Sequence, residues 1–281
     1  MTTTQHPVRR LASELWNKPH LISQEAFSEI TTYLAMRNAG MLATMEIEKV
    51  SANLDKPSNI NKIGLINVHG SLTNKPVESM CGATGTSYTG LMNQMSELVS
   101  AGCKTIVMDI ESGGGQAFNV FQTADAMRAM ADKHGVYMIA YVQSVAASAA
   151  YALAVMADEV IAHPQAQVGS IGVLVALMNN SKALEQAGIS RTFITAGANK
   201  IPFDASGEFR EGFLAEIQTQ VDELYDQFCE HVSSYTGLSV EEVKATEASC
   251  FSGPTAMKMG LVNKIMNNED FATYLTTRQG Q

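Results

Sequence analysis

The chain has 281 residues, of which 46% are hydrophobic and 17% are charged, and its formal net charge at neutral pH is −9. This composition is typical of a globular protein with a sizeable core and excludes a disordered chain. The acidic balance, without any run of Lys or Arg, excludes the basic surface that binding to nucleic acid or to anionic lipid requires.

The cysteines and the apolar stretches both point to a cytosolic protein. Four cysteines lie far apart and form no C-x-x-C pair, which favours reduced thiols. The first 19 residues lack the apolar core of a secretory signal. The longest nearly apolar stretch, Val145–Ala157, is shorter than the roughly 20 residues that cross a bilayer, so we expect a buried helix there. The cysteines are Cys81, Cys103, Cys229 and Cys250.

Residues 1–60 differ in pattern from the rest of the chain. Ser23 can cap a helix whose apolar residues recur at helical spacing, and Gly40 is a plausible end for it. The segment Ser51–Asn61 is rich in Asn, Ser, Asp and Pro and is predicted to be a linker. We therefore expect an N-terminal helical arm, packed on the core or on a neighbour, followed by one domain over residues 61–281. The apolar residues of the helix are Phe27, Ile30 and Leu34.

From Lys62 onward, short apolar strands alternate with helices. Strands joined by crossover helices predict a mainly parallel sheet in an α/β fold. The expected strands are 63–68, 105–110, 136–142, 159–162, one within 169–177, and 191–194. The expected helices are 91–99, one that starts near 117 directly after a glycine turn, one that opens near 148, one that ends at 187, and 208–235. The apolar stripe of the last helix is expected to face the core, although the helix is also a candidate interface.

The run Gly113-Gly114-Gly115 follows a predicted buried strand. Glycines at the start of a helix let backbone amides approach an anion or a developing oxyanion closely, although a flexible turn without function has the same composition. Phe118 stands where a dinucleotide fingerprint needs glycine, and no Lys-Ser or Lys-Thr follows, so nucleotide binding is disfavoured.

Ser148 follows a predicted strand and is flanked by small residues on both sides. An uncrowded hydroxyl at such a turn suits a nucleophile, but serine is also a common helix N-cap, and residue type alone favours capping.

A serine nucleophile needs a base. None of the six histidines has a persuasive acidic neighbour in sequence, so a Ser-His-Asp triad is open but unsupported. Lys200 lies in a segment poor in charge, and burial could lower the pKa of a lysine from about 10.4 toward neutrality. A lone lysine in such a place is otherwise a solvated surface residue. The histidines are His6, His20, His69, His134, His163 and His231.

Taken together, four segments resemble the signal peptide peptidase A family of serine peptidases, and within it the phage head maturation proteases. They are Ser-Gly-Gly-Gly after a strand, Ala-Ala-Ser-Ala-Ala-Tyr, Ala-Asp-Glu-Val-Ile-Ala and Val-Gly-Ser-Ile-Gly-Val. The resemblance runs from about residue 62 to 265, and the joint order and spacing are more specific than any single segment.

The resemblance implies a Clp protease/crotonase-like spiral of strand-strand-helix units and a Ser-Lys dyad, with no cofactor and no metal. Ser148 matches the nucleophile, Lys200, 52 residues later, matches the general base, and Ser170 matches the serine that orients the lysine. We expect the amides of Gly114 and Ala149 to form the oxyanion hole, with Gly113 or Gly115 as alternatives to Gly114.

The sequence departs from the family pattern at three places. Ser112 stands where many relatives have Pro, Ala149 where they have Gly after the nucleophile, and Ala196 where the lysine motif often has Ser. The first two remove no reacting group, and the third indicates a different loop around the lysine.

The phage branch implies cleavage of scaffold, of portal or coat protein and of the protease itself, inside a procapsid in the host cytoplasm, by a homo-oligomer. Gln281 follows shortly after the core, so the scaffold-like tail of many phage relatives is expected to be a separate chain or missing. Three alternatives stay open: a soluble bacterial peptidase that degrades signal peptides, a crotonase-type acyl-CoA enzyme, and a non-enzymatic capsid scaffold component.

Overall fold

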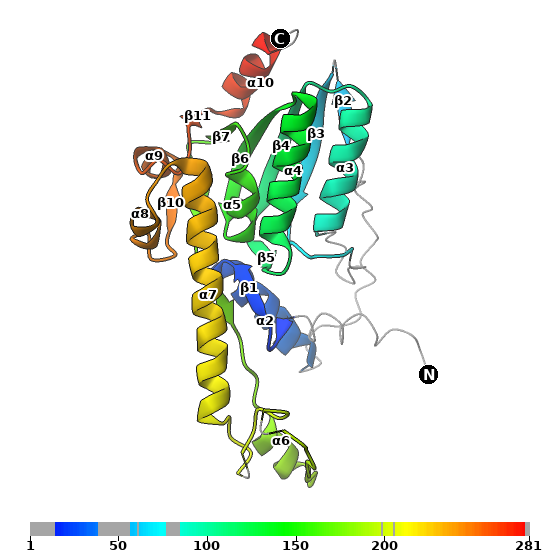
Figure 1. Cartoon of the computed structure of the whole chain (residues 1–281), viewed down its shortest axis with the longest axis vertical. Coiled ribbons are helices and arrows are strands. Elements are labelled where there is room, and N and C mark those ends of the chain that lie inside the picture. Colours follow the sequence, from blue (N-terminus) through cyan, green and yellow to red (C-terminus); the bar gives the residue numbers. More distant parts are fainter. Residues whose placement is uncertain are drawn as a thin grey trace.

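The fold is built on a parallel sheet. The computed structural model describes residues 15–38, 57–60, 62–76, 85–197, 199–204 and 206–278. Strands β3 (Ile63–His69), β4 (Thr105–Ser112) and β6 (Tyr137–Ala147) run parallel at the centre of an eight-stranded sheet (Figure 1). The strand order is β10-β8-β6-β4-β3-β2, and β7 branches from β6 and pairs with β11. Among the described strands of this sheet, only the edge pairs β2–β3 and β8–β10 are antiparallel.

The remaining elements surround this sheet. The other strands are β1 (Pro19–Ile22), β2 (Ser58–Ile60), β5 (Gly114–Gln116), β7 (Glu159–Ala162), β8 (Gln167–Gly169), β9 (Leu174–Val175), β10 (Cys250–Ser252) and β11 (Lys264–Ile265). The helices are α2 (Gln24–Asn38), α3 (Tyr88–Ser100), α4 (Val120–His134), α5 (Ala149–Ala154), α6 (Ser181–Gln186), α7 (Glu211–Thr236), α8 (Val240–Lys244), α9 (Gly253–Lys258) and α10 (Asn268–Thr277). Within the described part of the chain, no helix has the length and apolarity needed to span a bilayer.

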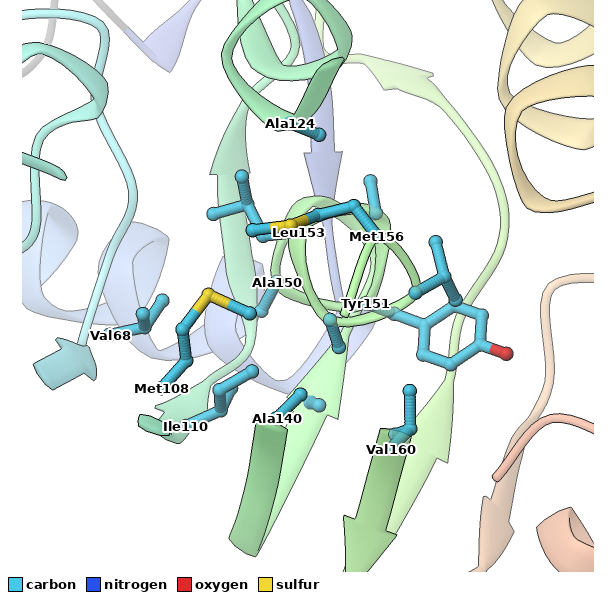
Figure 2. Packing of buried hydrophobic residues seen from close by; sticks show 14 of the residues in the cluster. Val68, Met108, Ile110, Ala124, Ala140, Ala150, Tyr151, Leu153, Met156 and Val160 are labelled. Atoms are coloured by element: carbon cyan, nitrogen blue, oxygen red, sulfur yellow. The ribbon is translucent and has the colours of Figure 1, made fainter. Parts of the chain in front are cut away.

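The two faces of the sheet are covered differently. Successive side chains of a strand point to opposite faces, and both faces of β4 and β6 are apolar because both are covered. One face packs against α3, α4 and α5 in the larger core cluster. Figure 2 shows Ala150 and Leu153 of α5, and Met156 just after it, in this packing above Met108 and Ala140 of the sheet. The other face carries α10, whose Phe271 stacks on Tyr141.

Most of the predicted elements are confirmed, and three predictions are wrong. Residues 191–194 form no strand. The glycine run does not lead directly into a helix, because Gly114 and Gly115 pair with neighbouring strands as β5 and the helix begins only at Val120. Val145–Ala157 is not one helix, since its first three residues extend β6 and only Ala149–Ala154 is helical.

The N-terminal segment, residues 15–38, packs directly on the domain. The predicted helix is present as α2, and the Ser23 side chain accepts a hydrogen bond from the Ala26 amide at 3.3 Å. The preceding strand β1 was not expected. It lies between β5 and β9 in a separate three-stranded sheet and pairs antiparallel with both.

Residues 176–210 project from the domain as an excursion that we call the α6 arm. It lies at the far end of α7 from the core, and none of its described residues is buried (Figure 1). Buried residues of α7 occur only in its C-terminal half, from Phe228 to Val232. The expectation that the whole apolar stripe faces the core is therefore wrong for Phe213, Ile217 and Val221. These residues stay partly exposed because the first half of α7 extends beyond the domain core.

Candidate active site

Ser148 occupies a strained turn between a strand and a helix. It joins β6 to α5 with φ 57° and ψ −119°, a backbone conformation that a residue with a side chain adopts only when its surroundings impose it. Its side chain makes no capping hydrogen bond; the Oγ donates to the Gly172 carbonyl at 3.4 Å instead. Capping therefore does not account for this serine, whereas a sharp strand-to-helix turn is the geometry that presents a nucleophile.

Ser170 directly follows β8, the strand that pairs with the end of β6 next to Ser148. The Ser148 amide donates to the Gly169 carbonyl at 2.8 Å, and Ala147 pairs with Gly169 across the sheet. Ser170 itself has φ 53°, and its amide donates to the Ser249 carbonyl at 2.9 Å. The sheet therefore brings together the two serines that sequence places 22 residues apart.

Gly114 and Ala149 are also neighbours. A Cβ built on Gly114 would lie 3.1 Å from the Ala149 nitrogen and 2.9 Å from the Ala147 carbonyl oxygen. The Gly114 amide donates to the Ser112 Oγ at 3.1 Å, and that hydroxyl donates to the Gly70 carbonyl at 2.6 Å. Sequence reasoning noted Ser112 only as a departure from a proline and missed that its hydroxyl fixes the glycine strand.

Lys200 is not close to Ser148 in the single chain. It is exposed in the α6 arm, whose Ile201 carbonyl accepts a hydrogen bond from Arg210, just before α7. His231, near the other end of α7, bonds to the Ala152 carbonyl of α5. At 1.5 Å per residue, the helix from Arg210 to His231 spans about 30 Å. Within one chain, the two serines and the predicted oxyanion residues therefore lie together. Lys200 lies away from them, and its side chain is exposed where burial was expected.

Among the described histidines, His69 and His231 form ion pairs with acidic side chains, and the hydrogen bond of the Ser148 hydroxyl goes to Gly172 instead. His69 lies 3.2 Å from Asp109, and this hydrogen bond raises the pKa of His69 despite partial burial. The pair lies on the α10 face of the sheet, opposite α5. His231 lies 3.8 Å from Asp125, and burial lowers its pKa. His6 lies outside the described residues, as does Cys81.

The parallel sheet defines an α/β protein, and the strained serine between β6 and α5 has the backbone geometry of a serine hydrolase nucleophile. A family model, "Peptidase family S49", matches residues 130–281, which is more than half of the chain. The chain belongs to peptidase family S49. This membership confirms the family resemblance and, with the parallel sheet, the Clp protease/crotonase-like fold class.

Three curated proteins illustrate the relationship. "Head-tail preconnector protein GP5" of Enterobacteria phage P21 is 29% identical over 85% of this chain and 48% of its own length. "Capsid assembly protease C" of Escherichia phage lambda is 30% identical over 77% of this chain and 49% of its own length. "Probable protease SohB" of Haemophilus influenzae is 27% identical over 69% of this chain and 55% of its own length. The chain thus spans about half the length of the two phage relatives.

Among solved structures, a mutant of ClpP1 from Listeria monocytogenes is similar, with a TM-score of 0.45 and 14% identity. The similarity covers 73% of this chain and 92% of the ClpP1 chain.

Proposed function

We propose that this protein is a serine endopeptidase in which Ser148 is the nucleophile. The observation that carries the proposal is the strained backbone of Ser148, held beside Gly114, Ala149 and Ser170. Ser148 attacks the peptide carbonyl, the amides of Gly114 and Ala149 stabilise the oxyanion, and water hydrolyses the acyl-enzyme. The oxyanion replaces Ser112 as the acceptor of the Gly114 amide.

In this proposal the base is Lys200 of a second copy. Within one chain, Lys200 lies away from Ser148 by about the length of α7 from Arg210 to His231. The α6 arm that carries Lys200 projects outward and can reach another molecule (Figure 1). The arm exposes large apolar side chains, as an assembly interface does: Ile189, Phe193 and Ile194. Lys200 takes the Ser148 proton and returns it to the leaving amine, and Ser170 orients the Lys200 amine.

The proposed substrates are those of the phage branch. The printed names of two relatives refer to capsid assembly and to a head-tail preconnector. We propose that this chain cleaves scaffold, coat or portal protein and itself, within a procapsid in the host cytoplasm. A cellular role in peptide degradation is the competing possibility, because relatives named as SohB proteases match much of the same chain.

Co-expression of two inactive variants tests the shared dyad. Ser148→Ala and Lys200→Ala each remove one half of the dyad, so neither alone should cleave unfolded casein. If each site takes its serine and its lysine from different copies, random co-assembly restores about a quarter of the parent activity. Restoration should be absent if both groups come from one chain, and full activity of either single variant would reject the dyad.

The pH dependence of the parent enzyme provides a second test of the same base. A lysine acts as a base only when it is uncharged, so kcat/KM should rise toward alkaline pH. A profile that instead rises through about pH 6–7 and then stays level would point to a histidine. Incubation with a phage scaffold protein, followed by mass spectrometry of the cuts, tests the proposed substrate.

A further inference from the structure

Strand β1 of the N-terminal segment fills a slot between two strands of the candidate active site. Its register places Ile22 opposite Gly114 and His20 opposite Gln116 on one side, and Pro19 opposite Val175 on the other. Both pairings are antiparallel. An added strand in such a slot is the way in which many proteins bind an extended peptide, through main-chain hydrogen bonds and alternating side-chain pockets.

The chain direction and the close contacts bring β1 to the predicted oxyanion residues. Its C-terminal end points toward Gly114, and a Cβ on Gly114 would lie 2.3 Å from the Leu21 carbonyl oxygen and 3.1 Å from the Ala149 nitrogen. A Cβ on Gly113 would lie 3.0 Å from the Ser23 Oγ. Gly114 therefore admits the backbone of the chain's own N-terminal segment, and Gly113 admits side chains of that segment.

The slot is closed while β1 lies in it. Ser148 has no solvent-exposed surface, although a nucleophile must meet an incoming carbonyl. Leu21 is also fully buried, and its side chain belongs to the larger core cluster. The surroundings of the Leu21 side chain are thus apolar and lie next to the turn that carries Ser148.

Beyond the N-terminal end of β1 the slot opens into a cavity of about 540 Å³. The cavity is lined by Pro19 and His20 of β1, by Phe118 after β5 and by Leu224 of α7. A polypeptide that entered along the path of β1 would find room there for its preceding residues.

We propose that β1 is an intramolecular inhibitor that occupies the substrate's place, and that the enzyme selects polypeptides with a large aliphatic side chain at the position of Leu21. The proposal rests on the proposed peptidase function. A substrate strand pairs with β5 and β9 after β1 leaves, and its aliphatic side chain enters the pocket that Leu21 vacates. The strained turn at Ser148 stays in place, because β6 and β8 hold it independently of β1.

A peptide-binding experiment tests the slot without any need for catalysis. The probe is a fluorescein-labelled peptide with the sequence of residues 15–24, and binding is followed by anisotropy. The protein is the full chain carrying Ser148→Ala, with and without Leu21→Asp. A charged side chain cannot be buried in the Leu21 pocket without a partner, so Leu21→Asp should release β1 and strengthen peptide binding on the order of tenfold or more. The matched control peptide, which carries the Leu21→Asp change itself, should not bind.

An activity experiment tests the inhibition. Leu21→Asp on the catalytically intact chain should accelerate both casein cleavage and the labelling of Ser148 by a fluorophosphonate, again on the order of tenfold or more. Leu21→Met keeps a large apolar side chain in the pocket and should stay near the parent rate. If Leu21→Asp does not fold, as circular dichroism would show, Leu21→Ala takes its place, because it removes only apolar contacts.

The outcomes separate this proposal from the proposed function. Equal rates for the parent and for folded Leu21→Asp, together with no binding of the parent peptide, would overturn the inhibitor and leave the peptidase standing. Saturable peptide binding without cleavage by any variant would uphold the occupied slot and reject the peptidase.

Discussion

The backbone around Gly114 leaves no room for a side chain. This residue has φ +96° and touches β1, the end of β6 and the start of α5 at once. Ser112 adds a hydroxyl that holds the Gly114 amide in place. The glycine run therefore works through close backbone approach, and not through the helix N-terminus that the sequence pattern indicated.

Substitution of Gly114 tests this packing against backbone strain alone. Gly102 also has positive φ, +77°, but a Cβ there would meet nothing within 4 Å. Gly102→Ala should therefore cost only about 1 kcal/mol of unfolding free energy, the usual cost of the left-handed conformation. Gly114→Ala adds overpacking against three backbone atoms and should cost about 2–4 kcal/mol and abolish casein cleavage. Urea denaturation measures both, and equal losses in the two variants would contradict the close approach.

Helix α10 is held on the sheet by contacts with a partly buried carboxylate. Glu159 of β7 accepts a hydrogen bond from Lys264 at 2.6 Å and another from the Tyr274 hydroxyl, and Arg278 lies 3.7 Å away. Burial alone would raise the pKa of Glu159, but hydrogen bonds from Lys264 and Tyr274 and the two positive charges together lower it below 4.5. A lowered pKa in the folded state means that Glu159 stabilises the fold above its unfolded pKa and that this contribution is lost as the pH falls through the folded pKa.

Glu159→Gln should therefore reduce stability in a pH-dependent way. At pH 7 the variant should lose about 1–3 kcal/mol, because it removes the negative charge that Lys264 and Arg278 face. The difference from the parent should shrink as the pH falls below about 4.5, since protonated Glu159 resembles glutamine. Urea unfolding at pH 7, 5 and 4 measures this, with Glu97→Gln on the exposed side of α3 as the control. A difference that stays constant with pH would contradict the assignment.

At the level of helices and strands, periodicity predicted the elements that pack on one another. The strands β3, β4, β6 and β7 and the helix α3 carry apolar patterns that burial explains, and all are present; α7 is present too, although only its C-terminal half is buried. Strand β1 escaped prediction, because four residues, Pro-His-Leu-Ile, give no periodic signal and their pairing with β5 is set by tertiary contact. The position of Ser148 at a strand-to-helix turn was predicted from a family motif, whereas the position of Lys200 depends on the path of the α6 arm, which no local pattern specifies.

In the whole molecule, the described chain carries an incomplete site and an unburied arm. Ser148, Ser170 and the proposed oxyanion residues lie in the domain, whereas Lys200 lies about 30 Å along α7 from the contact with α5. The partly exposed apolar residues in the first half of α7 extend the exposed surface of the arm. Assembly through this surface would bury the apolar residues and supply the missing base in one step.

Ile194 in the α6 arm is the position where this assembly can be tested with least damage to the fold. Its side chain is 96% exposed, so a change there removes no contact within the chain. A charge in an apolar interface is costly, so Ile194→Asp should reduce the assembly to monomers in sedimentation velocity and lower casein cleavage by about tenfold or more. Ile60→Asp is the matched control, since Ile60 is 68% exposed on β2, outside the arm, and the variant should assemble and cleave like the parent. Circular dichroism should show both variants folded like the parent, because neither side chain packs in the core. An Ile194→Asp protein that stays assembled and active would place the interface elsewhere and remove the arm from the catalytic site.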